Sequence, residues 1–141
     1  MGLSSRLKQG AGTISEISIL IVDDSTTIRA MLEEVLGREP GFRLIGSAAD
    51  AATAIRMIAE HHPDVTTIDV AMPGVDGLSL LDTIHLRTHA VMLTSHSEAA
   101  NDSYVRGALG FFDKSRIMRD AGKLVKIVRA AAEGKQTRAV A

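Results

Sequence analysis

The stretch that decides the fold is "ILIVDDSTTIR", residues 19–29. Four apolar residues, typical of a buried strand, run directly into Asp23 and Asp24 and then into hydroxyl residues that favour a helix start. Because adjacent carboxylates beside a buried strand repel each other, we expect a cation near this pair. The simpler alternative is that Asp24 or Ser25 only caps the helix.

Composition sets the class of protein. The 141 residues are 45% hydrophobic with a formal net charge of -1, which fits one globular domain. With no cysteine there is neither a disulfide framework nor a cysteine nucleophile. No basic run interleaved with aromatics predicts nucleic-acid binding, and no segment reaches the roughly 18 to 20 apolar residues of a membrane span. We therefore expect a cytoplasmic protein that binds neither nucleic acid nor membrane.

Short apolar runs alternate with helical periodicity along the chain. The predicted strands are residues 17–22, 42–47, 65–68, 90–93 and 111–112. Each predicted strand is followed by a predicted helix. Three helices have apolar residues at helical spacing, over 28–36, 51–59 and 78–84. A fourth covers 98–109, and the last begins at Ser115 or Asp120 and ends at Gly134. This alternation predicts an α/β fold with a doubly wound, five-stranded parallel sheet. The predicted boundaries are a disordered tail at 1–16, one domain at 17–134 and a short tail at 135–141.

The polar residues at the ends of the strands indicate the chemistry. Ligands bind beyond the carboxyl ends of the strands in such sheets, so we expect five side chains to converge there: Asp23, Asp24, Asp69, Thr94 and Lys114. Three carboxylates favour a hard divalent cation such as Mg²⁺. Asp69 is then a candidate nucleophile toward phosphorus, with Lys114 and Thr94 available to stabilise the transferred group.

Four motifs, "LIVDDS", "IDVAMPGVDG", "MLTS" and "FFDKS", resemble those of the response regulator receiver domain of two-component signalling over residues 17–134. The resemblance implies a flavodoxin-like, CheY-like fold with strand order 2-1-3-4-5. It implies that Asp69 accepts a phosphoryl group, that Mg²⁺ is held by Asp23, Asp24, Asp69 and the backbone carbonyl of Ala71, and that Lys114 contacts the phosphoryl oxygens.

The resemblance also implies a switch. Thr94 would move toward the new phosphate, and Phe111 would turn into the vacated space, with Phe112 pointing to the opposite face. The surface of the fourth helix, fifth strand and fifth helix, with Tyr104 and Arg106 exposed on it, would then bind a partner.

One position departs from the family pattern, and two others lie where members of the family vary. Ser115 stands where receivers usually have a proline after a cis bond, and we expect a trans bond here because a cis bond before a non-proline residue costs about 2.5 to 4 kcal/mol. Ala71 and His96 occupy positions that tune the lifetime of the phosphate. Since alanine cannot orient an attacking water, we expect slow autodephosphorylation unless His96 assists.

The predicted function is that of a single-domain response regulator, a self-catalysed phosphoacceptor rather than a conventional enzyme. Its donor would be a sensor histidine kinase or a histidine phosphotransfer protein, its target an unknown downstream protein, and its state a monomer or weak dimer. The alternatives are a receiver fragment of a longer transcription factor and a phosphorelay intermediate or phosphate sink. A haloacid dehalogenase-type phosphatase would need a D-x-D motif on the first strand, and a flavodoxin-like cofactor site would place Asp23 and Asp24 against a phosphate.

Overall fold

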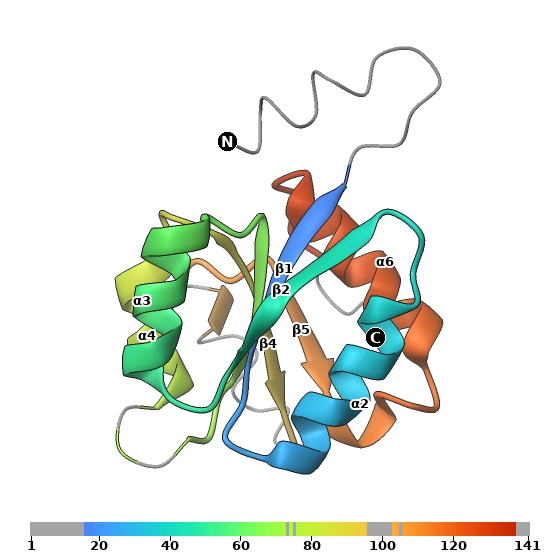
Figure 1. Cartoon of the computed structure of the whole chain (residues 1–141), viewed down its shortest axis with the longest axis horizontal. Helices are drawn as coiled ribbons and strands as arrows, with labels where there is room; N and C mark the ends of the chain where they lie inside the picture. Colours follow the sequence, from blue (N-terminus) through green and yellow to red (C-terminus); the bar gives the residue numbers. More distant parts are fainter. Residues whose placement is uncertain (1–15, 73, 75, 96–102, 105, 138–141) are drawn as a thin grey trace.

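The computed structural model describes residues 16–72, 74, 76–95, 103–104 and 106–137. Strands and helices alternate along these residues, as Figure 1 shows. The elements are β1 (Ile17–Val22), α2 (Thr26–Gly37), β2 (Phe42–Ala48), α3 (Ala51–His61), β3 (Val65–Asp69), α4 (Gly77–Ile84), β4 (His89–Thr94), β5 (Gly110–Asp113), the short 3-10 helix η2 (Lys114–Arg116) and α6 (Ala121–Ala132).

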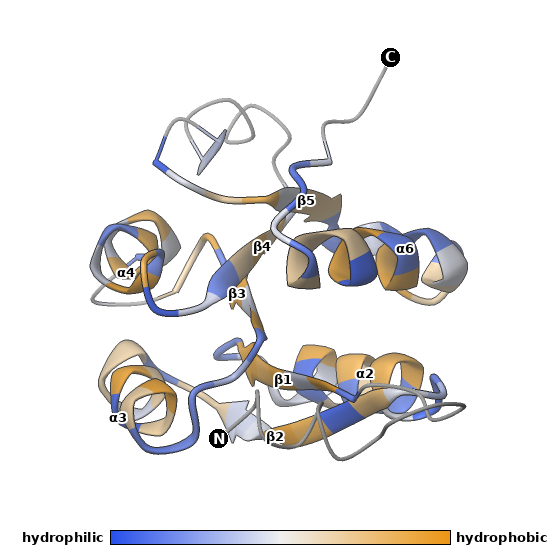
Figure 2. Ribbon diagram, turned by 90° about the horizontal axis from the view of Figure 1, so that it is seen from above, coloured by the Kyte–Doolittle hydropathy of each residue, from blue (hydrophilic) through white to orange (hydrophobic). Residues whose placement is uncertain are grey.

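The five strands form one parallel sheet in the order β2-β1-β3-β4-β5. Both the parallel sheet and its order confirm the sequence prediction. Viewed from above, α3 and α4 cover one face and α2 and α6 cover the other (Figure 2). Because both faces are covered, the inner strands β1, β3 and β4 are buried along almost their whole length rather than at every second residue.

Successive residues of each strand pack into two separate cores. Ile19 and Ile21 of β1 belong to the core under α2 and α6, whereas Leu20 belongs to the core under α3 and α4. The same alternation separates the two phenylalanines of β5: Phe112 is buried in the first core, and the partly buried Phe111 packs against the second. The prediction that they point to opposite faces is confirmed.

Side-chain caps begin three of the helices. Ser25 accepts a hydrogen bond from the Ile28 amide at 3.2 Å, so Ser25 rather than Asp24 caps α2. Asp50 and Asp76 cap α3 and α4 in the same way, each at 2.8 Å. Each cap satisfies an amide that the helix itself leaves without a partner.

The structure shifts several predicted boundaries. Strand β3 includes Asp69, and β4 includes Thr94, so both residues are held by the sheet itself. The last helix begins at Ala121 and ends at Ala132, before Gly134, while Ser115 lies in the separate helix η2. Residues 98–102 and 105 of the predicted fourth helix lie outside the described residues.

The chain already turns at 106–107, so the prediction that the fourth helix extends to Leu109 is wrong. Gly107 has a φ of 111°, a left-handed value that other residues rarely adopt, and such a residue ends a helix.

Residues 136 and 137 bind back onto the domain. The Thr137 amide donates to the Leu109 carbonyl at 2.8 Å, and the Gln136 side chain donates to the Ala108 carbonyl at 3.2 Å. The Tyr104 hydroxyl donates to the Thr137 carbonyl at 2.6 Å. Tyr104 is consequently only 8% exposed, so the prediction that it lies exposed on an output surface is wrong.

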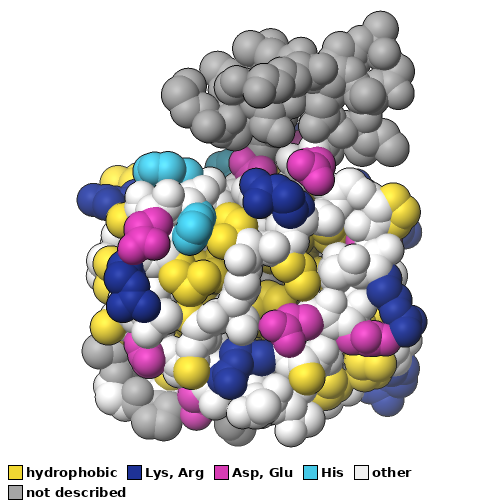
Figure 3. All heavy atoms as spheres, viewed as in Figure 1, with side chains coloured by type: hydrophobic (Ala, Val, Ile, Leu, Met, Phe, Trp, Pro, Cys, Tyr) yellow, Lys and Arg dark blue, Asp and Glu magenta, His cyan; other side chains and the backbone are white. Residues whose placement is uncertain are grey.

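The outer surface carries charges of both signs. Acidic and basic side chains are interspersed on the face seen in Figure 3. None of the helices in the described ranges combines the length and the apolar character that spanning a membrane requires.

Candidate functional site: an acidic pocket at the carboxyl edge of the sheet

Three carboxylates meet at one edge of the sheet. Asp23 follows β1, Asp24 is its neighbour, and Asp69 ends β3, the strand that pairs with β1. One carboxylate oxygen from each residue lies within 4.8 Å of the other two. Asp23 is 0% exposed and Asp69 is 1% exposed, whereas Asp24 faces solvent. The predicted convergence of the three acids is therefore found.

Lys114 enters the same pocket from the end of β5. Its Nζ lies 2.8 Å from Oδ2 of Asp23 and 3.1 Å from Oδ2 of Asp69, and its side chain is 15% exposed. A buried carboxylate pair is stable only when an opposite charge compensates it, and this ammonium supplies one.

Backbone amides orient the two buried carboxylates. Oδ1 of Asp23 accepts a hydrogen bond from the Ser25 amide at 2.8 Å, and Oδ1 of Asp69 accepts one from the Ala71 amide at 3.0 Å. Each residue thus turns its Oδ2 toward the pocket. Within the described part of the chain these Oδ2 atoms make ion-pair contacts with Lys114 but have no hydrogen-bond partner of good geometry.

The surroundings shift the ionisation of two groups. Burial raises the pKa of Asp69 to about 6, helped by the charge of Asp23 and opposed by the Ala71 amide and by Lys114. Burial lowers the pKa of Lys114, but its close contacts with the carboxylates of Asp23 and Asp69 outweigh this effect and leave that pKa above its usual value. At neutral pH the lysine is cationic and Asp69 is mainly ionised.

Thr94 and Phe111 lie on the strands next to the pocket. Thr94 ends β4, which runs between the strand of Asp69 and the strand before Lys114, and it is 2% exposed. It pairs with Asp113 in the β4–β5 register. Phe111 lies on β5 beside Met92. The roles that the resemblance assigns to these two residues stay predictions, and His96 lies outside the described residues.

Sequence reasoning missed two residues that hold the pocket together. Arg29 donates from Nη1 to the Asp23 carbonyl at 2.7 Å and so fixes the turn that carries the two acids. Its position one turn after the cap Ser25 is a weak signal for this contact. Gly77 begins α4, and a Cβ added there would lie 2.7 Å from the Val70 Cα and still closer to the Asp69 carbonyl. Only a residue without a side chain fits there.

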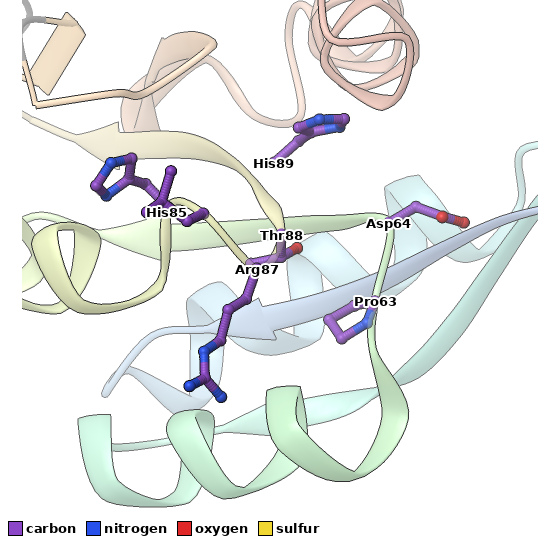
Figure 4. A pocket seen from close by; sticks show the side chains of 7 residues that line it. Pro63, Asp64, His85, Arg87, Thr88 and His89 are labelled. Atoms are coloured by element: carbon purple, nitrogen blue, oxygen red, sulfur yellow. The ribbon is translucent and has the colours of Figure 1, made fainter. Parts of the chain in front are cut away.

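A second pocket, of about 300 Å³, lies at the opposite end of the sheet. It is formed by the residues around the starts of β3 and β4, and Figure 4 shows Asp64, His85, Arg87 and His89 pointing in different directions. Its polar groups do not converge on one point, which a binding site requires. The acidic pocket, where charged groups do converge, is therefore the better candidate for a functional site.

The fold and the pocket together define a class of protein: a doubly wound α/β domain with an oxygen-only acidic site and a lysine at the carboxyl edge of its sheet. The family model described as the response regulator receiver domain matches residues 19–129. The chain belongs to the response regulator receiver domain family of two-component signalling.

Similar proteins agree with this assignment. The protein-glutamate methylesterase/protein-glutamine glutaminase 1 of Xanthomonas campestris is 40% identical over 131 residues, which cover 84% of this chain and 37% of that protein. The chain thus spans less than two fifths of the length of this curated relative. The crystal structure of the response regulator domain of Thermotoga maritima CheB has a TM-score of 0.78 and 27% identity, covering 84% of this chain and 97% of that chain. The crystal structure of the CheX-CheY-BeF3-Mg²⁺ complex from Borrelia burgdorferi has a TM-score of 0.73 and 28% sequence identity. The match covers 84% of this chain and 90% of that chain.

Proposed function

We propose that this receiver domain accepts a phosphoryl group on Asp69 in a reaction that depends on Mg²⁺. The observation that carries the proposal is the meeting of Asp23, Asp24 and Asp69 around one point with the Lys114 ammonium opposite them. Phosphoryl transfer depends mainly on positioning and on charge neutralisation, and these four side chains supply both.

The carboxylates suit a divalent cation. The two buried Oδ2 atoms lack hydrogen-bond donors of good geometry within the described residues, and all three acids offer oxygen ligands. Asp23, Asp24 and Asp69, with the carbonyl of Ala71, would hold Mg²⁺, which neutralises charge on a phosphoryl group when it is bound.

The protein's own residues perform the transfer. An Asp69 carboxylate oxygen forms the new O–P bond while the P–N bond of a phosphohistidine breaks and its electron pair returns to the imidazole. Lys114 then exchanges its contact with Asp69 for the phosphoryl oxygens. The Ala71 amide, which donates to Oδ1 of Asp69, keeps the other carboxylate oxygen directed toward the pocket.

The donor is a sensor histidine kinase or a histidine phosphotransfer protein in the cytoplasm, as membership of the family implies. After phosphorylation, inward movement of Thr94 and rotation of Phe111 would alter the surface next to β5 and so control a partner. That partner is either a separate downstream protein or, as the greater length of the curated relative suggests, an effector domain attached to the receiver. Exposed Ala71 cannot orient water, so loss of the phosphate is slow and an Ala71→Asn variant should lose it faster.

Incubation with acetyl phosphate, with and without Mg²⁺, tests the proposal when the intact mass is followed over time. The wild type should gain one phosphoryl group only when Mg²⁺ is present, and Asp69→Asn should gain none. An unmodified wild type at saturating donor and metal, or an Asp69→Asn variant that is modified equally, would refute it.

A further inference from the structure

A tight turn surrounds Lys114 where β5 ends. Oδ1 of Asp113 accepts two hydrogen bonds from Ser115, one from its amide at 2.9 Å and one from its hydroxyl at 2.8 Å. Lys114 lies between these two residues. We call this pair of contacts the Asp113–Ser115 bracket. A single carboxylate oxygen thus ties together the backbone on both sides of the lysine.

The residues beyond the bracket are fixed independently of it. Phe112 on one side and Ile117 on the other are buried in the same core, and the Asp113 backbone pairs with Thr94 of β4. The Ile117 amide also donates to the Lys114 carbonyl at 3.3 Å. The Asp113–Ser115 bracket therefore determines the backbone conformation between Phe112 and Ile117.

The direction of this path matters because a lysine side chain is long and has several rotatable bonds. Its Nζ must reach both Asp23 and Asp69, and its backbone position determines whether one rotamer can meet both. Ser115 holds the pKa of Asp113 below its usual range through the two hydrogen bonds, with Arg116 and Arg119 adding to the effect. The acceptor therefore stays ionised at neutral pH, and hydrogen bonds to an ionised acceptor are stronger than those to a neutral one.

We propose that the Asp113–Ser115 bracket is a positioning device that sets the backbone from which Lys114 reaches the acidic pocket. The inference rests on the proposed function, because the lysine so placed is the one that would contact the phosphoryl group. Asp113 is a positioning residue and acts only through Lys114. A bracket that merely stabilised the turn would affect unfolding without affecting the contacts of the lysine.

Asp113→Ala removes the acceptor, whereas Asp113→Asn keeps an oxygen that can accept both bonds, since asparagine also forms such turns. Asp120→Ala is the matched control: Asp120 contacts Arg116 at 3.5 Å, and its side chain makes no capping hydrogen bond. All three variants remove a carboxylate close to Arg116, and only Asp113→Ala removes the bracket.

Two readouts separate this inference from the proposed function. The first is the rate at which an amine-acetylating reagent labels Lys114, measured by peptide mass spectrometry without metal or phosphodonor. The second is the rate of phosphorylation by acetyl phosphate at saturating Mg²⁺. The Kd for Mg²⁺, measured by calorimetry, serves as the control that the metal site itself is unchanged. We expect Asp113→Ala to label about three- to tenfold faster and to phosphorylate about three- to tenfold slower, with the Kd for Mg²⁺ changed by less than about twofold.

Asp120→Ala should match the wild type in both readouts, and Asp113→Asn, whose neutral oxygen accepts weaker hydrogen bonds, should lie between the wild type and Asp113→Ala. If Asp113→Ala does not fold, Ser115→Ala, which removes only the hydroxyl donor, should show a smaller shift in the same directions. Labelling of Lys114 in Asp113→Ala that equals labelling in Asp120→Ala would overturn the inference, as would an Asp113→Asn variant that behaves like Asp113→Ala. A wild type that is never phosphorylated would defeat the proposed function alone, because the labelling rates still decide the role of the bracket.

Discussion

Nζ of Lys114 lies 2.8 Å from Oδ2 of Asp23, so a residue at the end of the last strand neutralises a residue at the end of the first. The same ammonium lies 3.1 Å from Asp69. This contact compensates two buried negative charges that no other described cation approaches within ion-pair distance. The stability of the domain and the chemistry of its pocket are therefore linked through one side chain.

Lys114→Met should lower the free energy of unfolding by about 2 to 4 kcal/mol at neutral pH, because removing one partner of a buried ion pair leaves charges uncompensated. At about pH 5, where Asp69 takes up a proton, the loss should be smaller. Urea unfolding of the variant and of Lys126→Met, which changes an exposed lysine of α6, measures the difference. Equal losses in the two variants would show that the contact does not stabilise the fold.

Asp69→Asn should make the metal-free domain more stable at neutral pH. The folded pKa of about 6 lies above the ordinary value of an aspartate, so the folded state holds this proton more tightly than the unfolded state. The stabilising effect of the proton is complete below about pH 4 and is lost as the pH rises through about 6. Asparagine avoids that loss, so we expect a gain of about 1 to 3 kcal/mol at pH 7 and almost none at pH 4. A gain that is the same at both pH values would contradict the shifted pKa.

Gly77→Ala should disturb the pocket through the backbone. The added Cβ would overlap the backbone of Asp69 and Val70, so the loop must shift, at a cost of about 1 to 3 kcal/mol in unfolding free energy and with slower phosphorylation. Gly122→Ala is the control, because nothing lies within 4 Å of its added Cβ and alanine favours the helix there by about 0.5 to 1 kcal/mol. Thermal unfolding should move the two variants in opposite directions. A stable, fully active Gly77→Ala variant would mean that the loop adapts freely.

Tyr104→Phe should loosen the segment that follows α6. It removes the hydrogen bond to the Thr137 carbonyl, which we expect to contribute about 0.5 to 1.5 kcal/mol. Hydrogen exchange of the Thr137 amide, which donates to Leu109, should accelerate in the variant while the amides of β1 keep their protection. Unchanged exchange at Thr137 would show that the backbone contacts alone hold this segment.

The sheet and the pocket were predictable because both follow from short-range patterns. Five short apolar runs predict the five strands, and three of these runs end beside Asp23, Asp69 and Thr94. A parallel sheet brings the carboxyl ends of its strands to one edge. The burial of Tyr104 was not predictable, because it depends on residues 136 and 137 packing back onto the domain. Periodicity within one helix carries no information about such remote contacts.

The start of the last helix shows the same limit. Ser115 and Asp120 are both reasonable cap residues, and the sequence left both open. In the structure Asp113 accepts the bonds from Ser115 and begins a short 3-10 helix, after which Asp120 precedes α6. The sequence places Lys114 between Asp113 and Ser115, but only the structure shows that the Asp113 side chain accepts both bonds from Ser115.

A crystal structure of the domain with Mg²⁺ and beryllium trifluoride, which imitates a phosphoryl group on a carboxylate, would show whether Asp69 is the phosphoacceptor. We expect the metal among Asp23, Asp24 and Asp69, the beryllium on an Asp69 oxygen and a fluorine in contact with Lys114. Electron density for neither group in this pocket at saturating concentrations, or a metal bound elsewhere, would contradict this expectation.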